Sequence, residues 1–109
     1  MTKVTIYKNL EKECVGFRVC GHAGYADEGE DIVCAAISIL VINTMNAIET
    51  YTKATVSQQA DETQGIIEYQ IKTPTKETTL LLDTMVLGLQ TLEDNKDYQD
   101  YIDLIFEEV

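Results

Sequence analysis

The chain has 109 residues, a length sufficient for one domain with a core that needs neither disulfides nor a metal. Its formal net charge is −11. Its 45% hydrophobic and 25% charged residues are typical of a soluble globular protein. The excess of acids argues against direct nucleic-acid binding, which needs clustered Lys and Arg, and favours basic partners.

The N-terminus and the cysteines predict the cellular compartment. Met1 leads directly into the strand-like VTIYK without a signal peptide. The longest apolar run, Ile32 to Ile42, is too short to span a bilayer. The three cysteines are an odd number, which indicates reduced thiols in a chain without an export signal. We therefore expect a cytoplasmic protein.

Two short strands are predicted first, joined by NLEKE as a hairpin. The first centres on Val4 and Ile6 and ends at Asn9. The second is CVGFRVC, residues 14–20, in which apolar and other residues alternate. One face of it carries Val15, Phe17 and Val19, and the other carries Cys14, Arg18 and Cys20. The same alternation would place Cys20 and His22 on one face.

A loop and a long helix follow the second strand. Gly21, Gly24 and Gly29 punctuate the loop. Asp31 is a good N-cap residue for the helix IVCAAISILVINTMNAIETYTK. Because apolar residues occupy nearly every side of its first three turns, we expect a central, buried helix.

The rest of the chain predicts two strands, a second helix and a final strand. ATVSQQA and GIIEYQIK are the strands, with DETQG as their turn. KETTLLLDTMVLGLQTLEDNK is an amphipathic helix, and YIDLIFEEV alternates as a strand. The order is strand, strand, helix, strand, strand, helix, strand. It predicts a single domain over residues 1–109, of the α+β class, with an antiparallel or mixed sheet packed against two helices.

Cys34 is the strongest candidate for chemistry. With Asp31 as the N-cap it lies in the first helical turn, where the positive end of the helix dipole favours a thiolate. His22 is the only imidazole in the chain and could serve as proton carrier, if the glycine loop folds back. Free N–H groups at the start of the helix would then stabilise an oxyanion. The alternatives are a small buried cysteine and a loop histidine without a chemical role.

Two further residues are accessory candidates. Asp31 could cap the helix, orient the imidazole, or do both. Ser38 follows Cys34 by four residues and so shares its helix face. It could hydrogen-bond near the site or bond back to the helix backbone.

The other two cysteines offer competing interpretations. Cys14 and Cys20 are strand residues without a helix dipole, and we rank both below Cys34 as nucleophiles. A metal site would combine these three thiols with His22, but its spacing lacks the close cysteine pair of structural zinc sites. We therefore expect neither a metal nor another cofactor.

The stretch GHAGYADEGEDIVCAAIS, preceded by GFRVC, resembles the signature of the ribosomal-processing cysteine proteases, the Prp family. The shared features are a Gly-His-Ala turn, a glycine-bearing loop, and Asp-Ile-Val-Cys-Ala-Ala opening a helix. The resemblance is specific from Gly21 to Ser38. The C-terminal half matches in pattern only.

This resemblance implies a function. Such proteases are cytoplasmic homodimers that remove a short N-terminal extension from a large-subunit ribosomal protein precursor. Their Cys–His pair matches Cys34 and His22, and their nearby acid and serine match Asp31 and Ser38. Gly21 matches a glycine thought to let the loop move. The peptide carries hydrophobic and aromatic residues before the cut and basic sequence after it.

Two other functions stay open at this stage. A ribosome-assembly binding protein without catalysis would have an unreactive Cys34. A redox-sensing protein would pair Cys34 with Cys14 or Cys20 in a disulfide.

Overall fold

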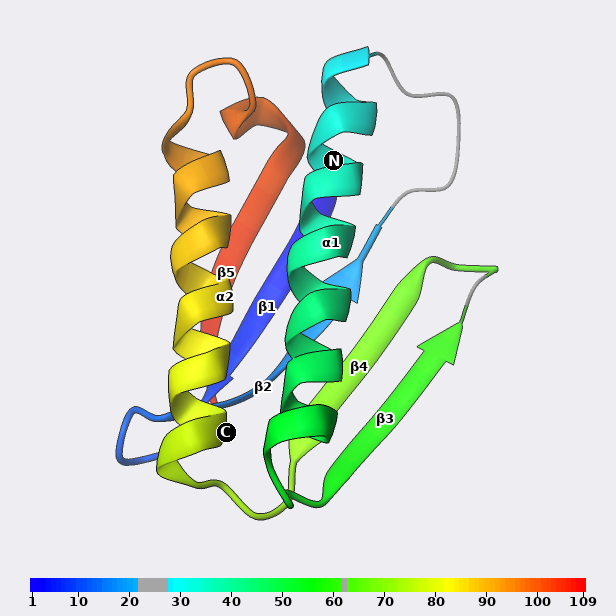
Figure 1. Cartoon of the computed structure of the whole chain (residues 1–109). Helices are drawn as coiled ribbons and strands as arrows, with labels where there is room; N and C mark the ends of the chain where they lie inside the picture. Colours follow the sequence, from blue (N-terminus) through cyan, green and yellow to red (C-terminus); the bar gives the residue numbers. More distant parts are fainter. Residues whose placement is uncertain (22–27, 62) are drawn as a thin grey trace.

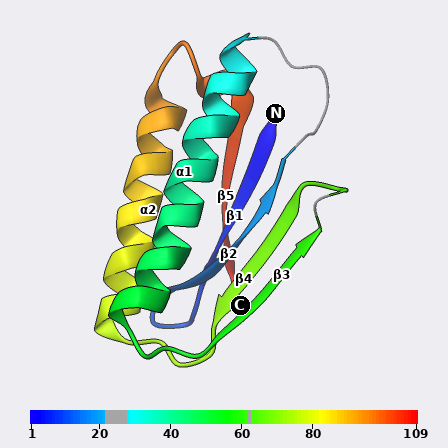
Figure 2. The ribbon, with the colours of Figure 1, turned by 45° about the vertical axis from the view of Figure 1, so that its right-hand side comes forward.

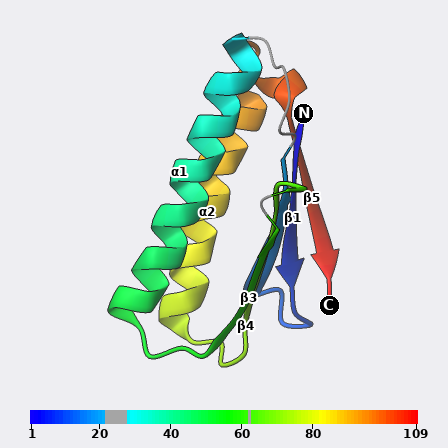
Figure 3. The ribbon, with the colours of Figure 1, turned by 90° about the vertical axis from the view of Figure 1, so that its right-hand side faces the viewer.

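The computed structural model describes residues 1–21, 28–61 and 63–109, with the backbone alone at 28–30. A five-stranded sheet forms one layer, and two helices on one of its faces form the other (Figures 1 and 3). The elements are β1 (Thr2–Lys8), β2 (Cys14–Cys20), α1 (Glu28–Tyr51), β3 (Val56–Asp61), β4 (Ile66–Ile71), α2 (Lys76–Asp94), the 3₁₀ turn η1 (Gln99–Tyr101) and β5 (Ile102–Glu108). The predicted order and the α+β class are confirmed.

The sheet is mixed, with the strand order β3-β4-β2-β1-β5. Its β1–β2, β2–β4 and β3–β4 pairs are antiparallel, whereas β5 lies parallel to β1. Figure 2 shows β3 and β5 at the two edges, with the helices on the same side of all five strands. Within residues 1–21, 28–61 and 63–109, no helix covers the opposite face of the sheet.

The hydrophobic core lies between the sheet and the helices. Alternation along the strands points Val4, Ile6, Phe17 and Tyr69 toward the helices, where each is at most 2% exposed. The Phe17 and Tyr69 rings stack with their centroids 5.2 Å apart. The helices contribute Val33, Ile37, Val41, Ile48, Leu82, Met85, Val86 and Leu89 to the same core.

A β-bulge near the start of β2 changes the predicted orientation of Cys14. Tyr7 pairs with Gly16 and Lys8 pairs with Cys14, so Val15 is an extra residue in the ladder. A bulge reverses the alternation beyond it, and Cys14 is fully buried in the core. The prediction that Cys14 shares a face with Arg18 and Cys20 was therefore wrong.

Helix α1 begins earlier than the sequence predicts. It starts at Glu28, so Gly29 is a helical residue rather than part of the loop, and Asp31 is the fourth helical residue rather than the N-cap. The first turn favours acids, which are frequent at residues 28–31, and one helical glycine costs only about 1 kcal/mol. Cys34 is consequently the seventh residue of the helix.

Helix α1 is buried on one face only, not on all sides. Val33, Ile37, Val41 and Ile48 face the sheet, whereas Ile39 is 71% exposed. The sequence predicted no membrane span because the longest apolar run, from Ile32 to Ile42, is too short. By length and composition alone, the longer helical segment Asp31–Tyr51 could cross a membrane. In this structure it is the helix that covers the core of a two-layer domain.

Candidate active site

Cys34 lies in a cavity of about 410 Å³ between the N-terminal half of α1 and the sheet. The residue is partly exposed. The walls are mainly aliphatic and come from both helix and sheet. They are formed by Thr2, Val19, Gly21, Cys34, Ile37, Ser38, Ala60, Asp61, Gly65, Ile66 and Ile67. A thiol at the edge of an apolar cavity can reach a carbonyl of a bound peptide while the walls hold its side chains.

Thr2 contacts the Cys34 thiol directly. Its Oγ1 lies 3.2 Å from Cys34 Sγ, a hydrogen bond in which either group can donate. Thr2 is 3% exposed because it continues the inward-facing alternation of Val4 and Ile6 at the start of β1. Thr2 was not among the site residues predicted from the sequence. One feature of the sequence could have indicated it: Thr2 is a polar residue at a strand position that faces the core, in line with Val4 and Ile6.

Gly21 leads the chain out of β2 at the edge of this cavity. Its N–H donates a 2.8 Å hydrogen bond to the carbonyl of Gly65, in the β3–β4 turn. Gly65 has a φ of +66°, and an added Cβ would lie 2.7 Å from the Gly21 carbonyl oxygen. Only glycine fits this close approach without a shift. The turn therefore fixes the residue that immediately precedes His22.

The structure brings together some of the predicted site residues. Ser38 lines the Cys34 cavity from the next helical turn, as its four-residue spacing predicts. Asp31 is exposed and lies about one turn before Cys34 on α1. Gly29 lies in α1. His22 and Gly24 lie outside the described residues, so their predicted roles stay predictions.

The start of α1 at Glu28 bears on the expected stabilisation of an oxyanion by free N–H groups. The unpaired N–H groups of a helix belong to its first four residues, here 28–31. The dipole effect falls off within the first turn, whereas Cys34, the seventh helical residue, lies in the second turn. The expectation that the free N–H groups at the helix start stabilise an oxyanion at Cys34 is therefore not supported by this geometry.

An acidic residue marks the mouth of the cavity at the β3–β4 turn. The Asp61 carboxylate accepts hydrogen bonds from the backbone N–H groups of Thr63 at 3.0 Å and Gln64 at 3.2 Å. These bonds shape the turn that carries Gly65. Asp61 is exposed and lines the cavity, so it adds negative charge beside Cys34.

All three cysteines are free thiols, and Cys14 and Cys20 do not line the Cys34 cavity. Cys14 and Cys20 begin and end the same strand, about 20 Å apart, so they cannot pair with each other in a disulfide, which needs Cα atoms within about 7 Å. Burial raises the pKa of the Cys14 thiol to about 11, which keeps it protonated at neutral pH. Cys20 lies with Arg18 on the helix-free face. Among the described residues, no group of three potential metal ligands is found.

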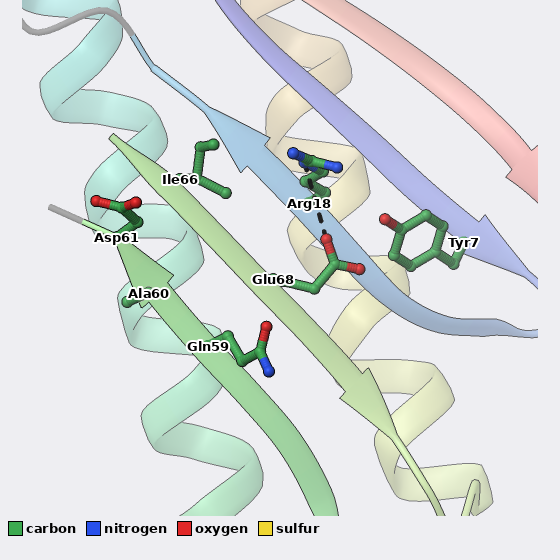
Figure 4. Close-up of a pocket in the computed structure, with 7 residues that line it drawn as sticks. All are labelled: Tyr7, Arg18, Gln59, Ala60, Asp61, Ile66 and Glu68. Carbon is green, nitrogen blue, oxygen red and sulfur yellow. Dashed lines mark ion pairs between the residues drawn. The ribbon is translucent and has the colours of Figure 1, made fainter. Parts of the chain in front are cut away.

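A larger cavity, about 660 Å³, lies on the helix-free face of the sheet (Figure 4). Arg18 and Glu68 form an ion pair there at 3.9 Å. Burial, and then the hydrogen bond and charge of Glu68, raise the pKa of Tyr7 to about 12. Cys34 does not line this cavity, whose walls are Tyr7, Arg18, Gln59, Ala60, Asp61, Ile66 and Glu68. We therefore place the candidate active site on the helix-covered side.

Known proteins are similar to this chain in both sequence and fold. The sequence model of the family described as cysteine protease Prp matches residues 1–103. A ribosomal processing cysteine protease Prp from Staphylococcus aureus is 33% identical over 95 residues, which cover 86% of this chain and 90% of that protein.

Two crystal structures of the Staphylococcus aureus protease are also similar. One, in complex with a substrate peptide, has a TM-score of 0.89 and 30% identity. The other, with a covalently linked product peptide, has a TM-score of 0.84 and 31% identity. Each alignment covers 98% of this chain and all of the other.

Proposed function

Because this chain belongs to the Prp family of cysteine proteases, we propose that it is a site-specific endopeptidase that uses a dyad of Cys34 and His22. The position of Cys34 carries the proposal, since this partly exposed residue lines a mainly apolar cavity large enough for peptide side chains. Gly21 lines the same cavity and directly precedes His22 in the chain.

The proposed reaction proceeds through a thioester. The Cys34 thiolate attacks the scissile carbonyl, the C–N bond breaks, and His22 gives its proton to the leaving amine. Water then hydrolyses the acyl-enzyme, with His22 taking the proton of the attacking water. Asp31 and Ser38 are proposed as accessory residues, because both lie within one turn of Cys34 on α1.

The proposed substrate is the N-terminal extension of a large-subunit ribosomal protein precursor. Two observations support it: relatives are described as ribosomal processing proteases, and one was solved with a substrate peptide. The aliphatic walls around Cys34, including Val19, Ile37 and Ile67, suit the hydrophobic residues expected before the cut. The net charge of −11 favours approach of a basic precursor in the cytoplasm.

We also propose that the protein acts as a homodimer. Ile32, Ile39 and Ile42 are 46%, 71% and 49% exposed, and their spacing places them on the side of α1 away from the sheet. On α2, Leu80 and Leu87 are 66% and 64% exposed. These five side chains, the helix-layer patch, suit an apolar interface with a second copy.

Peptide cleavage by purified variants tests the proposed activity. With a peptide that copies such an extension, we expect Cys34→Ala to lose about 10⁴-fold or more in kcat/KM and His22→Ala about 10²- to 10⁴-fold. Cys20→Ala is the matched control and should cleave at the wild-type rate. Cleavage that persists in Cys34→Ala would sink the assignment of the nucleophile.

A further inference from the structure

The Cys34 cavity is one of two cavities that lie along α1 on the helix-covered side of the sheet. A second cavity of about 280 Å³ lies further along α1 on the same side of the sheet. Residues from α1, the loop after it, β3 and β4 line it. They are Met45, Asn46, Ile48, Glu49, Ala54, Val56, Gln58 and Tyr69.

The two cavities follow each other along the three elements that line both of them, α1, β3 and β4. On β3, Ala60 belongs to the first cavity and Gln58 to the second, and residues two apart share a strand face. On β4 the same holds for Ile67 and Tyr69.

Helix α1 also lines both cavities with one of its sides. Ser38 lines the first cavity and Met45 the second, seven residues apart and on one helix side. Cys34 lies at one end of this row of residues and Glu49 at the other. The two cavities therefore lie in line along α1, β3 and β4, and we call them together the α1–β3 groove.

The groove has the length of an extended peptide segment. Cys34 and Glu49 are fifteen residues apart on α1, which is about 22 Å at 1.5 Å per residue. An extended peptide advances about 3.3 Å per residue, so about seven residues cover this distance.

The far end of the groove has an apolar wall and an acid. Met45 and Val56 are partly buried and pack against the core, so they offer apolar surface. Glu49 is exposed beside them, and its charge contributes, after burial, to the raised pKa of Tyr69. A lysine or arginine side chain fits this pattern, since its aliphatic stem covers apolar surface while its charged end meets a carboxylate.

We propose that the cavity around Met45 and Glu49 is a distal subsite that binds a lysine or arginine side chain of the peptide whose scissile bond lies at Cys34. The bound residue is about seven positions from that bond. This subsite rests on the proposed function of Cys34 and adds a specificity determinant far from the reacting atoms.

Peptides of equal length that carry Lys or Glu at five to nine positions from the scissile bond, on either side, test the subsite. Wild-type protein should prefer Lys over Glu about threefold, through KM, at one or two adjacent positions. Glu49→Lys should reverse that preference. Asp83→Lys, on the exposed side of α2, makes the same charge change and should leave it intact.

The outcomes separate the subsite from the protease assignment. If wild-type protein cleaves but Glu49→Lys keeps the wild-type Lys-to-Glu ratio at every position, the subsite is wrong. An equal change in Asp83→Lys would also overturn it, because the effect would then be one of net charge. If no peptide is cleaved, fluorescence anisotropy of the same peptides with Cys34→Ala shows whether the Glu49-dependent preference exists without catalysis. Its absence there refutes the subsite.

Discussion

Thr2 Oγ1 lies 3.2 Å from Cys34 Sγ, where a hydroxyl can donate a hydrogen bond to a thiolate. Hydrogen bonds to charged groups are worth about 1.5 to 3 kcal/mol, more than bonds between neutral groups. The contact is partly buried, since Thr2 is 3% exposed and Cys34 is partly exposed. We therefore expect Thr2 to act through Cys34, as a positioning residue for the thiol.

Replacing Thr2 by the similarly shaped Val removes the hydroxyl and keeps the packing. We expect kcat/KM for peptide cleavage to fall about tenfold, because the hydrogen bond to Cys34 Sγ is lost. Thr2→Ser should restore the cleavage rate. Equal cleavage rates in wild type and Thr2→Val would show that the contact is structural only.

At this scale the sequence predicted positions that follow from helical spacing. Ser38 shares the Cys34 cavity because the two are four residues apart. Thr2 could not be predicted in the same way. Its proximity to Cys34 depends on the packing of β1 against α1, across 32 residues of sequence, and no local pattern encodes that contact.

At the scale of elements, the β3–β4 turn supports the end of β2. The Gly65 carbonyl accepts a hydrogen bond from the Gly21 N–H. Gly65 also has a positive φ, which other residues rarely adopt. Since Gly21 precedes His22, the turn controls where the chain leaves the sheet beside Cys34.

Substituting Gly65 by Ala tests this support. The positive φ and the approach to Gly21 should lower the free energy of unfolding by about 1 to 2 kcal/mol, and hence the Tm by about 5 to 10 °C. Calorimetry and peptide cleavage should both show a loss.

Gly88→Ala is the matched control. Its added Cβ would approach only the flexible end of Leu40, 2.8 Å away, and alanine favours a helix. If the two substitutions have equal effects on Tm and cleavage, the β3–β4 turn does not support the site.

The elements themselves were predictable where one period runs without interruption, as in β4 and α2. The errors occur where two local rules compete. Asp31 is a good N-cap residue, yet α1 starts three residues earlier, because acids also suit the first turn. The bulge at Val15 depends on pairing with β1, which alternation within β2 cannot reveal.

At the scale of the whole molecule, the two faces differ in character. The helix-layer patch exposes five large aliphatic side chains, whereas the free face of the sheet carries charged and polar groups such as Arg18 and Glu68. The sequence predicted a helix buried on all sides because composition alone does not say how many layers cover it. In a two-layer domain one side of α1 has no neighbour among the described residues, and we assign that side to the proposed dimer.

Charge placed in the helix-layer patch should dissociate the dimer. Light scattering after size exclusion should give twice the 12.2 kDa chain mass for wild type and a single chain mass for Ile39→Glu. Leu10→Glu is the matched control, because Leu10 is 78% exposed in the β1–β2 loop. A monomeric wild type, or a dimer that survives Ile39→Glu, would contradict this assignment.

Covalent trapping is the most direct measurement of which thiol reacts. A peptide chloromethyl ketone that ends at the residue before the cut is incubated with wild-type protein and with His22→Ala. Digestion and mass spectrometry then locate the adduct. We expect one peptide per chain, on Cys34, formed at least tenfold more slowly in His22→Ala. An adduct on Cys20, or cleavage that continues after Cys34 is fully modified, would contradict Cys34 as the nucleophile.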